Sequence, residues 1–193
     1  LLMTLLAWIF ADSHSGVFDR VAPGLLALFP FIVMFLVTSV TTLRERTGGT
    51  LERLLAMPMG RLDLILGYAL AFGVVACVQA ALAVALSVGA LGLNIAGSVW
   101  LLGAIAVLDA VLGTALGLFV SAFARTEFQA VQFLPALVIP QMLLCGLLVA
   151  RDQLPRALEL VSDVLPLSYA VDAMTAVSTG DATWDIASDI GVV

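Results

Sequence analysis

Apolar residues in this chain gather in long stretches that short polar segments separate. Four of these stretches reach the length of about 20 residues that a helix needs to cross a bilayer. They lie at residues 24–43, 62–91, 98–122 and 128–150. Two shorter segments, at 1–11 and 186–193, are interpreted as the end of a first span and the start of a sixth. The pattern predicts an all-α polytopic membrane protein in which residues 1–193 form a single transmembrane domain.

The composition indicates the same class. The chain is 62 % hydrophobic and 11 % charged, with a mean hydropathy of +1.15. Soluble domains are roughly 45–50 % apolar and about 25 % charged. A water-exposed globule of this composition would therefore have too little polar surface, and we expect the lipid bilayer to be a partner of the chain.

The basic residues narrow the possible activities. All eight are arginine, and the chain has no lysine. Because a phosphate-binding P-loop requires a lysine, this chain is not itself a P-loop ATPase, and we expect no catalytic residues in it. His14 has no second histidine or cysteine near it, and Cys77 and Cys145 lie within apolar runs. The sequence therefore indicates no metal site.

The arginines also predict the orientation. Four of the eight lie in segment 44–61, and Arg125 lies between two spans on the same side. Short cytoplasmic loops are enriched in basic residues, so we place these segments in the cytoplasm. Nine of the fourteen acidic residues fall on the opposite side. The net charge of −6 therefore belongs to the outer face and does not indicate a nucleic acid as partner.

The cytoplasmic segment 44–61 predicts one short helix. A glycine turn at 48–49 and a cap at Thr50 predict a helix over 50–57, which is too short to be stable alone. Leucines share one face of it. They are Leu51, Leu54 and Leu55. The spacing leaves two interpretations open, a helix resting on lipid headgroups and a peg whose leucines dock into a groove of a cytoplasmic partner.

Two motifs resemble one family of membrane proteins. The first runs Arg44-Glu45-Arg46-Thr47-Gly48-Gly49-Thr50-Leu51-Glu52-Arg53-Leu54-Leu55, followed by Pro58. The second comprises Leu134-Pro135, Cys145-Gly146, Leu154-Pro155 and the segment from Leu165 to Met174. Together they resemble the permease subunits of type-2 ATP-binding-cassette (ABC) exporters, and most of all the daunorubicin-resistance branch. The resemblance covers essentially the whole chain, although many members have a single glycine where this chain has two.

This resemblance implies a six-helix permease fold whose first and sixth spans are incomplete in the chain. It implies the permease subunit of an ATP-driven exporter that moves a hydrophobic or amphipathic compound, such as a drug or lipid, out across the cytoplasmic membrane of a bacterium. Its partners would be cytoplasmic ABC ATPase subunits, which bind ATP and Mg, and a second permease copy in a homodimer or heterodimer. The chain itself would bind no cofactor.

The resemblance also assigns roles to segments. The helix at 50–57 corresponds to the coupling helix, which contacts the ATPase. The residues implied in this contact are Glu45, Thr50, Leu51, Glu52, Arg53, Leu54 and Leu55. Helical spacing of apolar residues predicts two short helices within 151–178. The resemblance makes them a re-entrant hairpin at an exit gate, and the alternative is two helices lying flat on the outer surface.

Polar groups inside the predicted spans are candidates for a substrate path or gate. Asp109 lies near the middle of a span, where an ionisable side chain is costly and suggests a function. Gln132, Gln141 and Tyr169 complete this candidate set. Asp109 also suggests alternatives to the exporter: a proton-coupled secondary transporter, or, if no transport occurs, a membrane scaffold. Gly113 and Gly117 form a small-xxx-small pair that predicts a packing seam within the chain.

Overall fold

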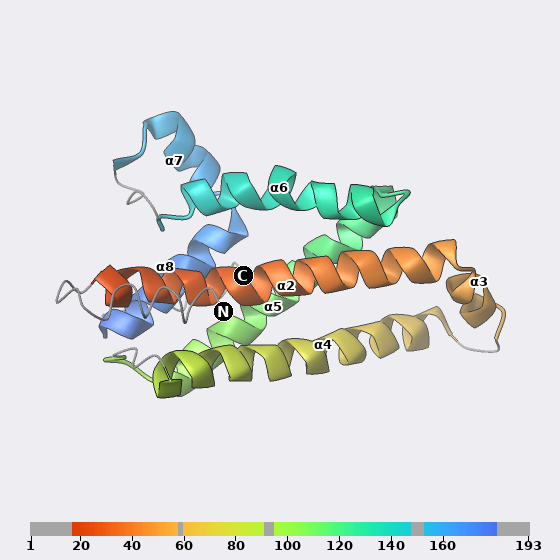
Figure 1. Cartoon of the computed structure of the whole chain (residues 1–193), viewed down its shortest axis with the longest axis horizontal. Coiled ribbons are helices and arrows are strands. Elements are labelled where there is room, and N and C mark those ends of the chain that lie inside the picture. The colour runs from red at the N-terminus through yellow and green to blue at the C-terminus, as the bar shows by residue number, and fades with distance from the viewer. Residues whose placement is uncertain (1–16, 58–59, 91–94, 148–152, 181–193) are drawn as a thin grey trace.

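A computed structural model of the chain describes residues 17–57, 60–90, 95–147 and 153–180 (Figure 1). These residues form helices, which confirms the all-α class. The helices are α2 (Val17–Thr47), α3 (Thr50–Leu55), α4 (Arg61–Ala85), α5 (Val99–Phe123), α6 (Glu127–Leu144), α7 (Arg156–Ser162) and α8 (Pro166–Thr179), with a π-helical turn η1 (Leu86–Ala90) after α4. The expected segments 1–11 and 186–193 lie outside the described residues.

Within the described ranges, four helices are long and apolar enough to cross a membrane, namely α2, α4, α5 and α6. The number rises to five if α7 and α8, which are bent by 86° at their junction, form one broken span. The membrane-length helices also carry apolar side chains on their outer surface. On α4, for example, the large hydrophobic side chains of Leu70 and Val74 are exposed. A helix that is apolar all round is typical of a membrane span.

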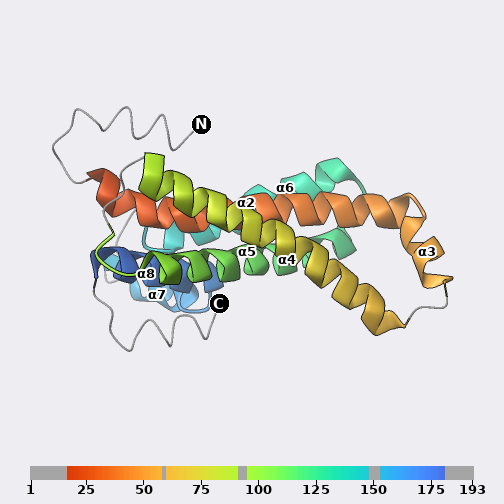
Figure 2. The same ribbon diagram turned by 90° about the horizontal axis from the view of Figure 1, so that it is seen from below.

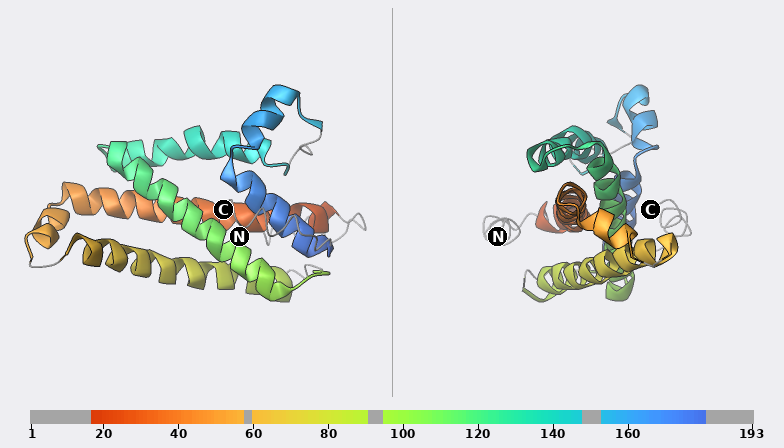
Figure 3. Two further views of the ribbon diagram at one scale, coloured as in Figure 1. Left: turned by 180° about the vertical axis from the view of Figure 1, so that it is seen from behind. Right: turned by 90° about the vertical axis from the view of Figure 1, so that its right-hand side faces the viewer.

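Helix α2 is the centre of the bundle. It contacts α4, α5, α6 and α8, and its largest contact is with α5. Figure 1 shows α4 and α6 on opposite sides of α2, and the views from behind and from one end show α5 crossing α2 obliquely (Figure 3). The core accordingly forms around α2, where Phe31, Met34 and Phe35 are fully buried.

The close contact between α2 and α5 depends on two glycines. A Cβ atom built on Gly113 would lie 2.4 Å from the Phe31 carbonyl oxygen, and one on Gly117 would lie 2.6 Å from the Phe35 carbonyl oxygen. Both distances are far inside van der Waals contact, so the two backbones meet where side chains are absent. The predicted packing seam within the chain is confirmed.

The helix bounds differ from the expected segments in two places. Helix α2 begins at Val17 and continues through Pro23 and Pro30, so neither proline starts or breaks it. The Gln79 amide nitrogen on α4 donates to the Pro30 carbonyl oxygen at 3.4 Å. Helix α6 ends at Leu144 rather than near residue 150, because Gly146 takes a φ of +87° that cannot continue a right-handed helix.

The two ends of the bundle differ in chemistry. One end, called here the arginine-rich end, holds α3, the last turn of α2 and the α5–α6 connection, and Figure 2 shows α3 projecting beyond the spans there. The opposite end holds α7 and α8. Helix α8 packs against α2 and α5 and buries an apolar face. Its buried apolar residues are Leu167, Ala170, Val171, Ala173, Met174 and Val177.

Candidate functional site

Helix α3 is joined to α2 by a tight turn at two glycines. The Gly48 N–H donates to the Arg44 carbonyl oxygen at 2.8 Å, and Gly49 has a φ of +73°. This left-handed conformation costs glycine little but strains other residues. The cap position falls on Gly49, and the helix begins at Thr50 with no side-chain cap. The expectation that Thr50 is the N-cap is therefore wrong, because the second glycine makes the turn one residue earlier.

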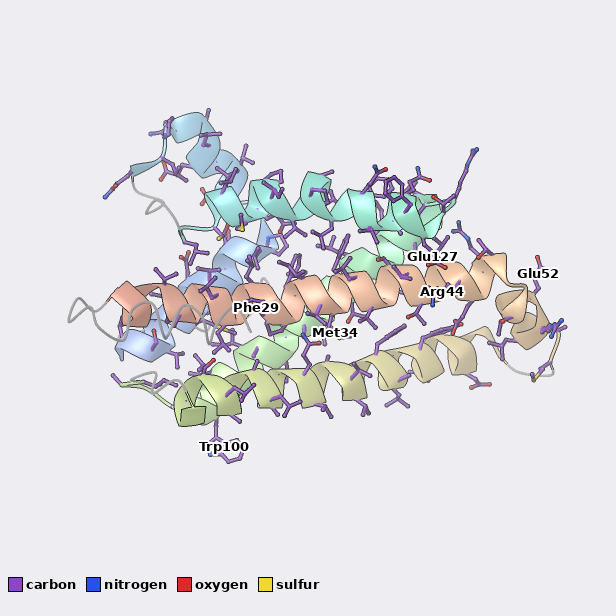
Figure 4. All side chains as sticks on the ribbon, in the orientation of Figure 1. Phe29, Met34, Arg44, Glu52, Trp100 and Glu127 are labelled. Atoms are coloured by element: carbon purple, nitrogen blue, oxygen red, sulfur yellow. The ribbon has the colours of Figure 1, made fainter. Side chains whose placement is uncertain are left out.

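The side chains of α3 lie open at the tip of the arginine-rich end. Glu52 projects from this helix (Figure 4), and both it and Arg53 are exposed. In the described part of the chain, neither side chain has a hydrogen-bond or ion-pair partner. Leu54 is half-buried, and Met57, just beyond the helix, is 49 % exposed. The side chains of Leu51 and Leu55 lie outside the described residues. A helix of six residues is too short to be stable by itself, so α3 depends on the helices that flank it.

Charged side chains join the ends of the spans beside α3. Arg44 at the end of α2 forms a two-point ion pair with Glu127 at the start of α6, with Nε–Oε1 and Nη2–Oε2 distances of 2.7 and 2.8 Å (Figure 4). The Tyr68 hydroxyl on α4 donates to a carboxylate oxygen of Glu45. The last turn of α2 is therefore tied to α4 and α6. Glu45 bonds within the chain, whereas Glu52 has no side-chain partner among the described residues.

Arg46 joins α2 to the end of α5. Its Nη1 and Nη2 atoms donate to the carbonyl oxygens of Ala122 and Ala124 at 3.0 and 2.8 Å. The last carbonyls of a helix have no partner within the helix, and a nearby cation also interacts favourably with the helix dipole. Arg46 thus fixes the position of the α5–α6 connection relative to α2.

We expect Arg46→Ala to lower the free energy of unfolding by about 1 kcal/mol, because two charged hydrogen bonds are lost at an exposed site. Arg46→Lys should lose about half as much, since lysine keeps the charge but not the two-point geometry. Thermal unfolding in detergent measures both, with Arg53→Ala as the matched control. An Arg46→Ala protein as stable as the Arg53→Ala protein would contradict the assignment.

The intramembrane candidates do not form one group. Asp109 is completely buried on α5, and Gln141 is buried on α6 with its Oε1 atom lacking a partner among the described residues. Gln132 lies on the exposed side of α6, away from these buried groups. The Tyr169 hydroxyl donates to the Asp163 carbonyl oxygen at 2.6 Å, so it connects α8 to α7. Within the described ranges, no three histidine, cysteine or acidic side chains gather closely enough to hold a metal ion.

No role was predicted from the sequence for Tyr68 or Glu127, and Arg44 and Arg46 were expected only as cytoplasmic charges within the first motif. A signal was available: all these residues lie within about two turns of the end of a span on the side of the membrane assigned to the arginines. The short connection 124–126 between α5 and α6 places Glu127 on that same side. What the sequence lacks is the choice of partners, which depends on which helices are neighbours.

Comparison with known proteins identifies one family and several similar membrane proteins. The family model described as ABC-2 type transporter matches residues 1–178. The chain is 29 % identical over 166 residues to the probable multidrug ABC transporter permease YbhR of Escherichia coli, covering 86 % of this chain and 45 % of that protein. It is 27 % identical over 155 residues to the probable multidrug ABC transporter permease YbhS of the same species, covering 80 % and 41 %.

A eukaryotic relative is also similar. The ABC transporter G family member 20 of Dictyostelium discoideum is 27 % identical over 171 residues, covering 89 % of this chain and 23 % of that protein. The chain thus spans less than half the length of these relatives. No solved structure matches it. The family match over most of its length and the membrane-length helices together show that the chain belongs to the membrane family of ABC-2 type transporters.

Proposed function

We propose that this chain forms the membrane path of an ATP-driven exporter and that α3 couples it to a separate ATPase subunit. The observation that carries the proposal is the geometry of α3. It projects from the arginine-rich end and is anchored to α2 by the glycine turn, and its Glu52 and Arg53 side chains have no partner in the described part of the chain. A short anchored helix with free charges and an apolar residue, Leu54, is suited to dock into a groove of another protein.

Charge supports the orientation in this proposal. Arg44, Arg46, Arg53 and Arg125 all lie at the end of the bundle that carries α3. With basic residues on the cytoplasmic side, α3 faces the compartment that holds ATP. The absence of lysine from the chain, and therefore of a P-loop, is consistent with hydrolysis in another subunit. We place the protein in a bacterial cytoplasmic membrane, as a relative of the daunorubicin-resistance branch.

The opposite end would form the exit. Helices α7 and α8 turn by 86° relative to each other, and α8 packs into the bundle against α2 and α5. This packing favours the re-entrant arrangement over two helices lying flat on the surface. The Tyr169 hydrogen bond to the Asp163 carbonyl oxygen holds the angle between them. A second permease copy, identical or related, would complete the path between two such bundles.

The test is reconstitution in liposomes with the ATPase subunit that copurifies with the permease. The probe is a neutral amphipathic dye, the N-acetyl derivative of dansylcadaverine. We expect ATP-dependent accumulation of the dye that requires both subunits. No accumulation with both subunits and ATP present would overturn the proposal.

One observation favours a second candidate, a proton-coupled transporter. Asp109 is a buried carboxyl group with no partner among the described residues, and such groups in spans often carry protons. This candidate predicts dye accumulation driven by a pH gradient without any ATPase, and loss of that accumulation in Asp109→Asn. The same liposomes, tested with a pH gradient in place of ATP, distinguish the two candidates.

A further inference from the structure

Three consecutive residues in the last turn of α2 each hold a different span. The Arg44 guanidinium pairs with Glu127 at the start of α6. The next residue, Glu45, accepts a hydrogen bond from the Tyr68 hydroxyl of α4. The third, Arg46, donates to two carbonyl oxygens at the end of α5. These three residues, called here the joint, thus reach each of the other three membrane-length helices found in the described ranges.

The joint is also where α3 is anchored. Helix α3 contacts the bundle mainly through α2. The Gly48 N–H donates to the Arg44 carbonyl oxygen at 2.8 Å, so the turn that leads into α3 is bonded to the first residue of the joint. The backbone of Arg44 therefore holds α3 while its side chain holds α6. A displacement of α3 acts first on the joint, and the joint is bonded to three spans.

Of the four membrane-length helices in the described ranges, α6 is held least by packing. Only 17 % of its window is buried, against 61 % for α2 and 39 % for α5. Its first turns meet α2 and the α5–α6 connection in a small apolar cluster of Leu43, Ala124, Ala130 and Phe133. The two-point pair of Arg44 with Glu127 adds a fixed direction to this contact. Both side chains are at least half exposed, so water can solvate them when they separate.

The bond to α4 reaches a packed part of the bundle. The Tyr68 ring stacks on Phe72, one turn farther along α4, with ring centroids 6.1 Å apart. Phe72 in turn packs in a buried cluster with Met34 of α2 and Ala110 of α5. The Tyr68 hydroxyl therefore connects the joint to a contact of three spans that lies deeper in the bundle.

We propose that Glu127 and Tyr68 are positioning residues for transport, through which the joint passes movements of α3 to α6 and α4. The proposal rests on the function proposed above, in which an ATPase subunit docks on α3, and it names the residues that carry the coupling. A docked ATPase that shifts α3 displaces the Arg44 backbone, and the Arg44 side chain carries the start of α6 with it. Helices α4 and α6 lie on opposite sides of α2 (Figure 1), so one movement of α3 changes the spacing of the spans on both sides.

Exchange of the two charges tests the bond to α6. Variants are reconstituted in liposomes with the copurified ATPase, and the accumulated N-acetyl-dansylcadaverine is divided by the ATP hydrolysed. Arg44→Glu and Glu127→Arg each bring like charges together, and each should lower this ratio by about tenfold, within the usual range for coupling between distinct sites. The doubly exchanged variant restores an ion pair and should recover most of the ratio. Copurification of the ATPase and the thermal midpoint should change little, because the pair is exposed and α3 is untouched.

Arg125→Glu is the matched control. It makes the same charge change at the same end of the bundle, two residues before Glu127. The Arg125 side chain is exposed and has no partner among the described residues, so the ratio should stay unchanged. Tyr68→Phe removes one hydroxyl and should lower the ratio by about threefold, because a hydrogen bond is lost without bringing like charges together.

A label on α6 follows the movement itself. Phe128→Cys, in a protein whose Cys77 and Cys145 are replaced by alanine, places an environment-sensitive dye at an exposed position beside Glu127. Addition of the ATPase and ATP should change its fluorescence with the original or the exchanged pair, and much less with either single reversal.

The outcomes separate this proposal from the export function. Equal ratios in the original protein and the single reversals, an exchanged variant as impaired as they are, or a label response that does not depend on the pair would each overturn the proposal. A pair-dependent label response without dye accumulation would reject the export function alone. Failure of the ATPase to bind the original protein would overturn both.

Discussion

Replacing Gly113 by leucine is expected to separate α2 from α5 and to leave little folded protein in detergent. The new Cβ atom would begin 2.4 Å from the Phe31 carbonyl oxygen, and the next atoms would enter the α2 backbone itself. Overpacking of a well-packed interior costs about 1–3 kcal/mol and sometimes more. The upper part of this range applies, because the obstacle is backbone and cannot rotate away. The monodisperse fraction in size-exclusion chromatography and the thermal midpoint report the loss.

Gly103 provides the matched control on the same helix. A Cβ atom built there meets no atom within 4 Å, so Gly103→Leu should fold and unfold much like the original protein. Glycine also lowers helix stability relative to leucine, and the control variant therefore has no reason to lose stability. If Gly113→Leu and Gly103→Leu were equally stable, the seam between α2 and α5 would not be a close contact.

Replacing Leu54 by aspartate is expected to abolish copurification with the ATPase subunit while membrane insertion stays intact. Leu54 is half-buried on α3, so its side chain is available to a partner as well as to this chain. A charge at the centre of an apolar contact costs at least about 2 kcal/mol of binding free energy, or about 30-fold in affinity. A pull-down of the ATPase from detergent-solubilised membranes measures the effect.

Two controls separate docking from folding. Leu54→Met preserves an apolar side chain of similar size and should retain the ATPase. Leu160→Asp introduces the same charge on α7 at the opposite end of the bundle, where the side chain is 60 % exposed, and should also retain it. Normal recovery of the ATPase with Leu54→Asp would exclude α3 as the coupling helix.

Much of the fold could be predicted because apolar run lengths depend only on local composition. The stretch at 24–43 falls within α2, and the stretch at 98–122 matches α5 to within one residue at each end. The spacing of Gly113 and Gly117 also predicted the seam between two helices. The helix ends were less predictable. Gly49 and Gly146 adopt positive φ angles that set the start of α3 and the end of α6, and a glycine in a sequence does not reveal which conformation it takes.

The candidate sites likewise combine features that the local sequence predicts with features that only the packing of distant helices decides. The short helix after α2 was expected from leucine spacing and a glycine turn, both of which are local. The partners of its neighbouring charges were not, since Arg44 meets Glu127 from 83 positions away, and Glu45 meets a tyrosine from the next span. Gln132 and Gln141 looked equivalent in the sequence, yet one is exposed and the other buried, because only packing decides which side of α6 faces inward.

The sequence by itself determined that this chain belongs in a membrane and which end of its bundle carries the arginines. These properties depend on the amount and order of apolar and charged residues, which determine directly how a chain inserts into a bilayer. Only the tertiary structure decided that α2 is the central helix and that Glu45 bonds to Tyr68. It also decided that, among the described residues, Glu52 and the buried Asp109 have no side-chain partner. Such facts depend on which faces of distant helices meet, and in lipid that choice is made by close packing rather than by hydrophobicity.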